Sequence, residues 1–244
     1  MLCLAVRTSW CSLLEGFFPT HINIEHLLDV LPDMKFKMFP KRQSAGQKTV
    51  RVALARDPAF SFYYHANRSA LEAAGADIVE FSVIHDAEMP AADFLYIGGG
   101  YPELYREKLE ANVTMRESVR RFVESGGRFY AECGGLMYLS RAIEGSRMVG
   151  VLPTDIQLTD RPVDFGYCEV TTTRRSILGP AGTWLRGHQF HYSKCSKGSE
   201  SPVYAVTQGS REYREGWALP NGLASYVHLH FLSNPGVVRS VLES

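Results

Sequence analysis

The sequence predicts an α/β fold in which a mostly parallel sheet is flanked by helices on both faces. Short apolar runs alternate with helical patterns from Val50 to about residue 143. The connections between these segments are short, and glycines follow many of the expected strands and helices. Alternation of this kind is typical of parallel sheets whose two faces are both covered.

The first part of this pattern contains three strands and one helix. Valines predict a strand over Val50–Ala55. A helix is expected over 61–74 and ends at Gly75, and a second strand follows over 77–81. A third strand is expected over Phe94–Ile97 and stops at Gly98.

The second part continues with an amphipathic helix over 115–124, which Gly126 and Gly127 end. A fourth strand is expected over 128–131, and a helix over 136–143. After Gly150 the chain is β-rich and irregular, with a late strand over 226–231.

The first 48 residues differ from the rest in composition. Residues 22–31 have apolar side chains at helical spacing with Asn23 as N-cap, and the basic stretch 35–48 is typical of an exposed linker. We therefore expect a boundary that separates residues 1–48 from a domain over 49–244.

Charge and cysteine content exclude several classes of protein. Lys+Arg and Asp+Glu number 26 each, so the chain lacks the basic excess of most nucleic-acid-binding proteins. No apolar run approaches the ~20 residues of a membrane span. The five cysteines are widely spaced without a C-x-x-C, which argues against disulfides and a zinc site and favours a reducing, cytoplasmic setting.

Cys133 stands between an apolar strand and a helix, and Gly134 and Gly135 follow it. A nucleophile on a sharp strand-to-helix turn needs small neighbours, because the backbone there is closely packed. The following helix would lower the pKa of the thiol and stabilise an oxyanion. A buried structural cysteine is the alternative, and the surrounding pattern favours the nucleophile.

Gly98, Gly99 and Gly100 follow the third strand. Consecutive glycines let the backbone approach a ligand, and ligands of parallel sheets bind at the carboxyl ends of the strands. A plain flexible loop is the alternative. The chain contains neither a phosphate loop nor a dinucleotide-binding glycine motif.

His228 and His230 alternate on the late strand and therefore face the same side. A cysteine nucleophile needs a general base, which is usually histidine. Two core histidines or part of a metal site are the alternatives, and no cysteine or carboxylate lies nearby in the sequence to complete a metal site.

Residues from about Val50 to Pro235 resemble the C-terminal glutamine amidotransferase domain of cobyrinic acid a,c-diamide synthases, a flavodoxin-like class I domain. The motifs that carry the resemblance occur in the family's order. They are ARDPAFSFYY, FLYIGGGYPELY, FYAECGGLMYLS, MVGVLPTDI, GYCEV, RGHQFHYS and LASYVHLHF.

The resemblance implies an enzyme that hydrolyses glutamine and supplies ammonia for amidation of corrin side-chain carboxylates. Cys133 matches the nucleophile and His228 the base, with His230 as the fallback. Gly99 or Gly100, together with Gly134, would form the oxyanion hole. The partners implied are glutamine and a cobyrinate-like tetrapyrrole held by a synthetase domain or partner, and a homodimer is compatible with the resemblance.

Three departures from the family pattern qualify this reading. Only residues 19–31 resemble the family's ATP-dependent half, so ATP and Mg belong to a missing domain and this chain needs no cofactor of its own. His230 stands where many relatives have the third catalytic residue, a Glu, which is therefore absent or comes from elsewhere. Gln189 replaces a Glu and predicts a weakened polar contact in the pocket. A catalytically impaired binding module is the alternative function.

Overall fold

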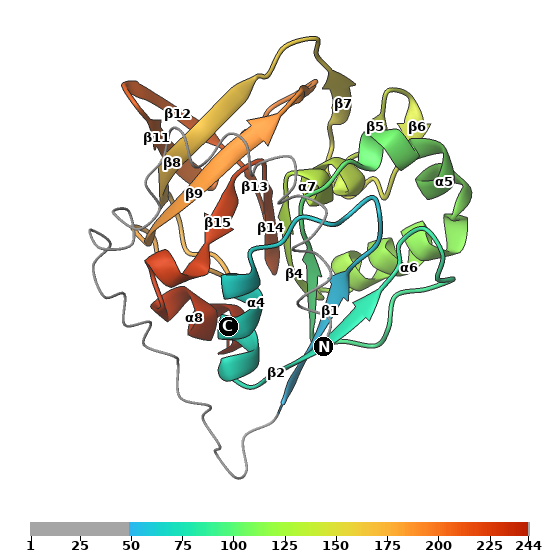
Figure 1. Ribbon diagram of the computed structural model, residues 1–244, viewed down its shortest axis with the longest axis horizontal. Helices are drawn as coiled ribbons and strands as arrows, with labels where there is room; N and C mark the ends of the chain where they lie inside the picture. The colour runs from blue at the N-terminus through green and yellow to red at the C-terminus, as the bar shows by residue number, and fades with distance from the viewer. Residues whose placement is uncertain (1–48, 244) are drawn as a thin grey trace, which may run out of the picture. The chain divides into compact units, whose positions relative to one another are not determined.

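The computed structural model describes residues 49–243. Its centre is a six-stranded sheet with the strand order β13-β14-β4-β3-β1-β2 (Figure 1). The strands in chain order are β1 (Val50–Ala55), β2 (Ala76–Phe81), β3 (Phe94–Ile97), β4 (Arg128–Glu132), β13 (Trp217–Leu219) and β14 (Gly222–Ser225). Only the β13–β14 pair is antiparallel, so the prediction of a mostly parallel sheet is confirmed.

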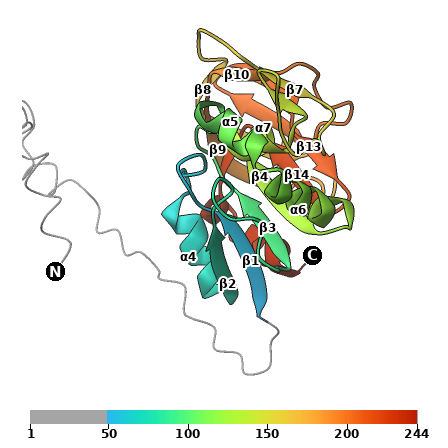
Figure 2. The same cartoon turned by 90° about the vertical axis from the view of Figure 1, so that its right-hand side faces the viewer.

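Both faces of this sheet are buried. Successive side chains of a strand point to opposite faces, and here each face contributes to an apolar cluster. Val52 and Leu54 of β1 belong to one apolar cluster, whereas Ala53 and Ala55 belong to another. Helices α4 (His65–Ala73) and α8 (Gly236–Glu243) pack into the first cluster. Helices α6 (Val113–Glu124) and α7 (Gly134–Leu139) pack into the second (Figure 2).

A second, antiparallel sheet covers the α4 side as well. Its strands have the order β12-β11-β8-β9-β15. They are β8 (Asp164–Thr172), β9 (Trp184–His191), β11 (Tyr204–Gln208), β12 (Arg211–Glu215) and β15 (His228–His230). Val170, Leu185 and Val206 of this sheet join the same cluster as Val52. The sequence indicated β-rich structure here but no arrangement for it.

The remaining elements lie around these two sheets. A four-stranded sheet has the order β10-β7-β5-β6, with β5 (Ala142–Ile143), β6 (Ser146–Arg147), β7 (Asp155–Leu158) and β10 (Ser193–Cys195). Helix α5 (Arg106–Ala111) and two 3-10 turns, η1 (Pro102–Tyr105) and η2 (Phe231–Ser233), complete the described part. Across residues 49–243, the helices are all too short or too polar to span a membrane.

Several boundaries differ from the expected ones, three of them with a bearing on the site. The helix expected from residue 61 begins at His65, because Phe62 pairs with Gly99 as an isolated β-bridge. The helix expected over 136–143 ends at Leu139, where Ser140 is extended. The late strand is confined to residues 228–230. The helix expected over 22–31 and the boundary at residue 48 lie outside the described residues and stay predictions.

Candidate active site

Cys133 occupies the sharp turn between β4 and α7. Its φ of 50° places it among the two non-glycine residues with positive φ in the described range. Such a backbone is unfavourable for a residue with a side chain and persists only where its surroundings fix it. The Cys133 N–H donates to the Ser225 carbonyl at 2.7 Å, which ties the turn to the end of β14.

The two glycines after Cys133 allow α7 to pack against the end of β3. A Cβ on Gly135 would lie within 3.0 Å of the Ile97 carbonyl oxygen. A Cβ on Gly134 would lie 3.0 Å from Pro102 Cδ and 3.1 Å from Gly100 N. The structure thus brings the Cys133 turn against the triple glycine, as the sequence predicted for a closely packed turn.

The backbone donors of the triple glycine are not equally available. The Gly98 N–H donates to the Tyr63 hydroxyl at 2.9 Å, and the Gly99 N–H donates to the Phe62 carbonyl at 3.1 Å. The Gly100 N–H has no hydrogen-bond acceptor among residues 49–243. Of the two expected oxyanion donors on this loop, Gly100 is therefore available and Gly99 is in use.

His228 lies directly against this loop. A Cβ on Gly99 would be closer than 3.0 Å to the His228 Cε1 atom. The imidazole stacks on His188, with ring centroids 4.7 Å apart, and meets the edge of Phe62 at 4.9 Å. Its Nδ1 atom lies 4.0 Å from a carboxylate oxygen of Glu132. The structure thus places His228 beside two of the expected site segments.

His230, the fallback base, has different surroundings. Its ring meets the edge of Tyr64 at 5.2 Å, and its backbone pairs with Arg186 of β9. The described contacts therefore place His228, and not His230, at Gly99.

The expectation of a lowered thiol pKa is wrong for this structure. Burial, together with the charges of Glu103 and Glu132, raises the pKa of the Cys133 thiol to about 12. Only the Gly134 N–H opposes them. Helix α7 has six residues, and Cys133 is 5% exposed, so desolvation of the thiolate outweighs the helix dipole. The thiol is therefore protonated at rest and depends on a base for activation.

The surroundings of His228 also have electrostatic consequences. Burial, together with the charges of His188 and His191, lowers the pKa of His228 to about 3. A neutral imidazole can accept a proton, so His228 is in the form that a general base requires.

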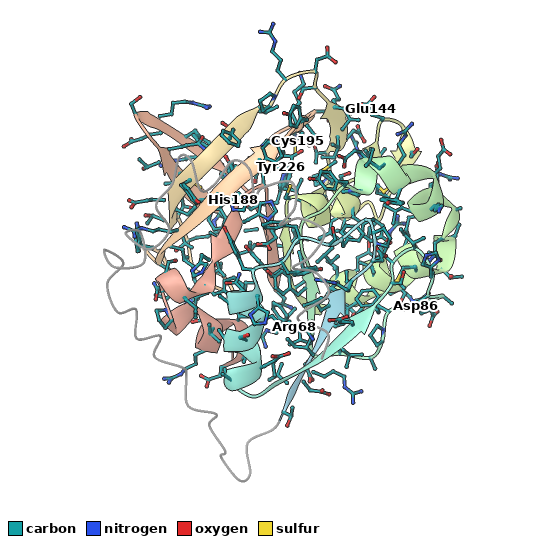
Figure 3. All side chains as sticks on the ribbon, viewed as in Figure 1. Arg68, Asp86, Glu144, His188, Cys195 and Tyr226 are labelled. Carbon is teal, nitrogen blue, oxygen red and sulfur yellow. The ribbon has the colours of Figure 1, made fainter. Side chains whose placement is uncertain are left out.

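Sequence reasoning missed the aromatic side chains that surround His228. Tyr64 shares a 2.6 Å hydrogen bond with His188 Nδ1, and His188 in turn stacks on His228. His188, labelled in Figure 3, is a residue of β9 and pairs through its backbone with His228 of β15. The signals were present, because DPAFSFYY and RGHQFHYS are unusually aromatic and histidine-rich, but nothing local assigned them chemistry.

Gln189 lies away from this cluster. It is buried and accepts a hydrogen bond from the Tyr213 hydroxyl, whereas its neighbour His188 faces the cluster. Adjacent residues of a strand point to opposite faces. The Glu-to-Gln difference therefore alters a buried contact with Tyr213, on the face of β9 opposite to His188, whereas the sequence predicted a weakened polar contact in the pocket.

No group of three or more His, Cys, Asp or Glu side chains within residues 49–243 is arranged to hold a metal ion. The cysteines of this range, Cys133, Cys168 and Cys195, are free thiols.

Comparison with known proteins agrees with this geometry. Residues 51–236 match the CobB/CobQ-like glutamine amidotransferase domain. The chain is 44% identical over 212 residues to a cobyrinate a,c-diamide synthase of Syntrophotalea carbinolica, covering 82% of this chain and 46% of that protein. It is 37% identical over 249 residues to a cobyrinate a,c-diamide synthase of Listeria innocua, and the match covers 97% of this chain and 54% of that protein. The chain thus spans about half the length of these curated relatives.

Solved structures share the fold at low identity. PurLQS from Thermotoga maritima superposes with a TM-score of 0.60 and 15% identity, covering 80% of this chain and 98% of that one. The crystal structure of a glutamine amidotransferase superposes with a TM-score of 0.53 and 19% identity, covering 79% of this chain and 97% of that one. These likenesses concern the fold alone. The match over residues 51–236 and the identity to the curated relatives show that the chain belongs to the family of CobB/CobQ-like glutamine amidotransferase domains.

Proposed function

We propose that this chain hydrolyses glutamine to glutamate and ammonia, with Cys133 as nucleophile and His228 as general acid and base. The ammonia would be used to amidate side-chain carboxylates of a cobyrinate-like tetrapyrrole. Activation of those carboxylates by ATP would take place on a synthetase domain or partner, as the resemblance implies, because the sequence contains no phosphate loop.

The chemistry starts from the protonated thiol. His228 takes the proton of Cys133 as the sulfur attacks the glutamine side-chain carbonyl carbon, and the oxyanion accepts hydrogen bonds from the Gly100 and Gly134 N–H groups. His228 then gives the proton to the amide nitrogen, the C–N bond breaks, and ammonia leaves a thioester. Water attacks the thioester with His228 taking its proton, and cleavage of the C–S bond releases glutamate and restores the thiol.

One observation carries the proposal, which is the convergence of three distant segments. The His228 ring packs on Gly99, Gly134 packs on Gly100, and the Cys133 N–H is bonded to Ser225 close to β15. This convergence at the carboxyl ends of parallel strands, where ligands of such sheets bind, supports the proposed roles of nucleophile, base and backbone donors.

The test is glutamate release from glutamine by the 244-residue chain. Cys133→Ala is expected to abolish release. Cys168→Ala is the matched control, because Cys168 is also buried and burial also raises its pKa to about 12. Equal release by the parent and Cys133→Ala would refute the proposal, as would absence of release by the parent both alone and with a synthetase partner.

A catalytically impaired binding module is the second candidate, and the burial of the Cys133 thiol favours it. A reactive glutamine analogue separates the two functions. Covalent labelling that Cys133→Ala abolishes and Cys168→Ala retains supports the enzyme. An inert Cys133 thiol supports the binding module.

A further inference from the structure

Glu132, the residue before Cys133, is a fully buried carboxylate at the end of β4. The hydroxyls of Tyr96 and Tyr130 each donate to it at 2.8 Å, one to each oxygen. The Leu229 N–H, directly after His228, donates to it at 3.3 Å. These three donors hold the carboxylate in one place beside both expected catalytic residues.

The Nδ1 atom of His228 is buried and has no hydrogen-bond partner among the described residues. Glu132 Oε1 lies 4.0 Å from it. The ring neighbours of His228 are Phe62 and His188, and neither carries negative charge. When His228 is protonated, the buried negative group nearest to its ring is therefore the Glu132 carboxylate.

We propose that Glu132 is the positioning residue that orients His228 and stabilises its protonated form. This inference rests on the proposed function. When His228 takes the Cys133 proton at Nε2, its Nδ1–H would donate a hydrogen bond to the Glu132 carboxylate. The carboxylate itself stays unprotonated in this step. When His228 returns the proton to the leaving nitrogen, the Nδ1–H and Glu132 stay as they were.

The separation of 4.0 Å is within the range of an ion pair between the carboxylate and a protonated imidazole. The position two residues after His228 cannot serve, since it holds His230, whose ring lies against Tyr64. The carboxylate that many relatives carry at that position thus has a counterpart in Glu132, 98 residues earlier in this chain, on the strand that pairs with β14.

The principal test compares Glu132→Gln with Glu215→Gln in the full chain. Glu215 is a matched control, because burial also raises the pKa of its carboxyl to about 7 and it is held by Ser225 and the Tyr226 N–H. Glu132→Gln is expected to lower kcat for glutamate release on the order of 10²-fold. Glu215→Gln is expected to stay within about twofold. An equal fall in both variants, or none in Glu132→Gln, overturns the inference.

A double variant asks whether Glu132 acts through His228. Glu132→Gln added to His228→Asn is expected to lower the rate of iodoacetamide alkylation of Cys133 no further than His228→Asn alone. Additive effects of the two substitutions would mean that Glu132 acts independently of the imidazole and would overturn the inference.

The pH profile supplies a readout that a structural role would not move. Burial raises the pKa of Glu132 to about 7, and the Tyr130 hydroxyl lowers it. In the parent, kcat/KM is therefore expected to fall below about pH 7 as the carboxylate loses its charge. Tyr130→Phe keeps the carboxylate and is expected to move this acid limb to higher pH, with activity retained above it. An unmoved limb would count against the inference even if Glu132→Gln failed to fold.

The other titratable side chains around Glu132 do not change their protonation near pH 7, where the acid limb is expected. Burial raises the pKa of each tyrosine and of Cys133 above its ordinary value and therefore away from neutral pH. These side chains are Tyr63 and Tyr64 before α4, Tyr96 on β3, Tyr130 on β4, Cys133 after it, and Tyr204 on β11.

The two proposals can fail separately. If the parent shows neither glutamate release nor labelling of Cys133 by a glutamine analogue, the proposed function fails and the role of Glu132 fails with it. If the parent is active and Cys133→Ala is not, but Glu132→Gln matches Glu215→Gln, only the inference on Glu132 fails.

Discussion

The imidazole of His228 lies where a side chain on residue 99 would have to sit. A Cβ on Gly99 would come closer than 3.0 Å to the His228 Cε1 atom and would lie 3.1 Å from its Nδ1 atom. The requirement for glycine at this position is therefore steric and is imposed by a residue 129 positions later in the chain.

Gly99→Ala is accordingly expected to displace the imidazole and lower kcat for glutamate release on the order of 10²-fold, because ångström-scale displacement of a catalytic group has effects of that size. Gly198→Ala is the control, since a Cβ there meets nothing within 4 Å. Steady-state kinetics measures the effect, and unfolding in urea separates it from a loss of stability. Parent-like kcat in Gly99→Ala would contradict the placement of His228.

Gly135 is constrained by backbone instead of by a side chain. A Cβ there would lie within 3.0 Å of the Ile97 carbonyl oxygen and 3.0 Å from Ile97 C. Strand β3 cannot give way easily, because β1 and β4 pair with its two edges. Gly135→Ala is expected to lower the free energy of unfolding by about 1–3 kcal/mol, measured in urea. Unchanged stability would show that α7 can shift away from β3.

Asn67 links α4 to the segment that carries His228. Its side-chain amide donates to the Leu229 carbonyl at 2.7 Å and accepts from the Phe231 N–H at 2.8 Å, and all of these groups are buried. Asn67→Ala leaves two buried backbone groups without partners and is expected to cost roughly 2–3 kcal/mol in unfolding free energy.

Ser69→Ala, on the same helix, is the control for this prediction, because the Ser69 hydroxyl makes only an exposed contact with His65. Chemical denaturation measures both variants. Equal stability of the two would show that the Asn67 bonds contribute little to holding β15.

The site was predictable where local sequence determines its geometry. Cys133 between a strand and two glycines specifies a tight turn, and the glycines proved necessary because of neighbours within van der Waals contact. The parallel sheet followed from alternation of strands and helices. The choice between Gly99 and Gly100 could not be made, because it depends on the pairing of Phe62 with Gly99, which ends the helical pattern early.

The proximity of Glu132 to His228 could not be predicted from the sequence either. Periodicity places Glu132 on a buried strand, but no local rule says which residue of a strand 96 positions later lies 4.0 Å away. The same holds for the thiol of Cys133. The helix dipole can be read from sequence, whereas the desolvation that outweighs it depends on the packed surroundings.

Glu215 links folding stability to pH. Burial raises the pKa of its carboxyl from the ordinary 4.5 to about 7. The folded state therefore binds a proton that the unfolded state has lost between these values, so the stabilisation is complete below pH 4.5 and is lost as the pH rises through 7. Glu215→Gln removes this dependence. From pH 5 to pH 7.5 the variant is expected to gain about 2–3 kcal/mol of unfolding free energy relative to the parent.

Urea unfolding of both proteins at the two pH values checks this. His228 has the opposite trend, because burial lowers its pKa from 6.5 to about 3 and the folded state loses stability as the pH falls through that range. Since both proteins contain His228, its contribution cancels in the difference between them. Parallel pH profiles for parent and Glu215→Gln would show that the Glu215 carboxyl is ionised in the folded protein throughout this range, stabilised by its bonds to Ser225 and the Tyr226 N–H.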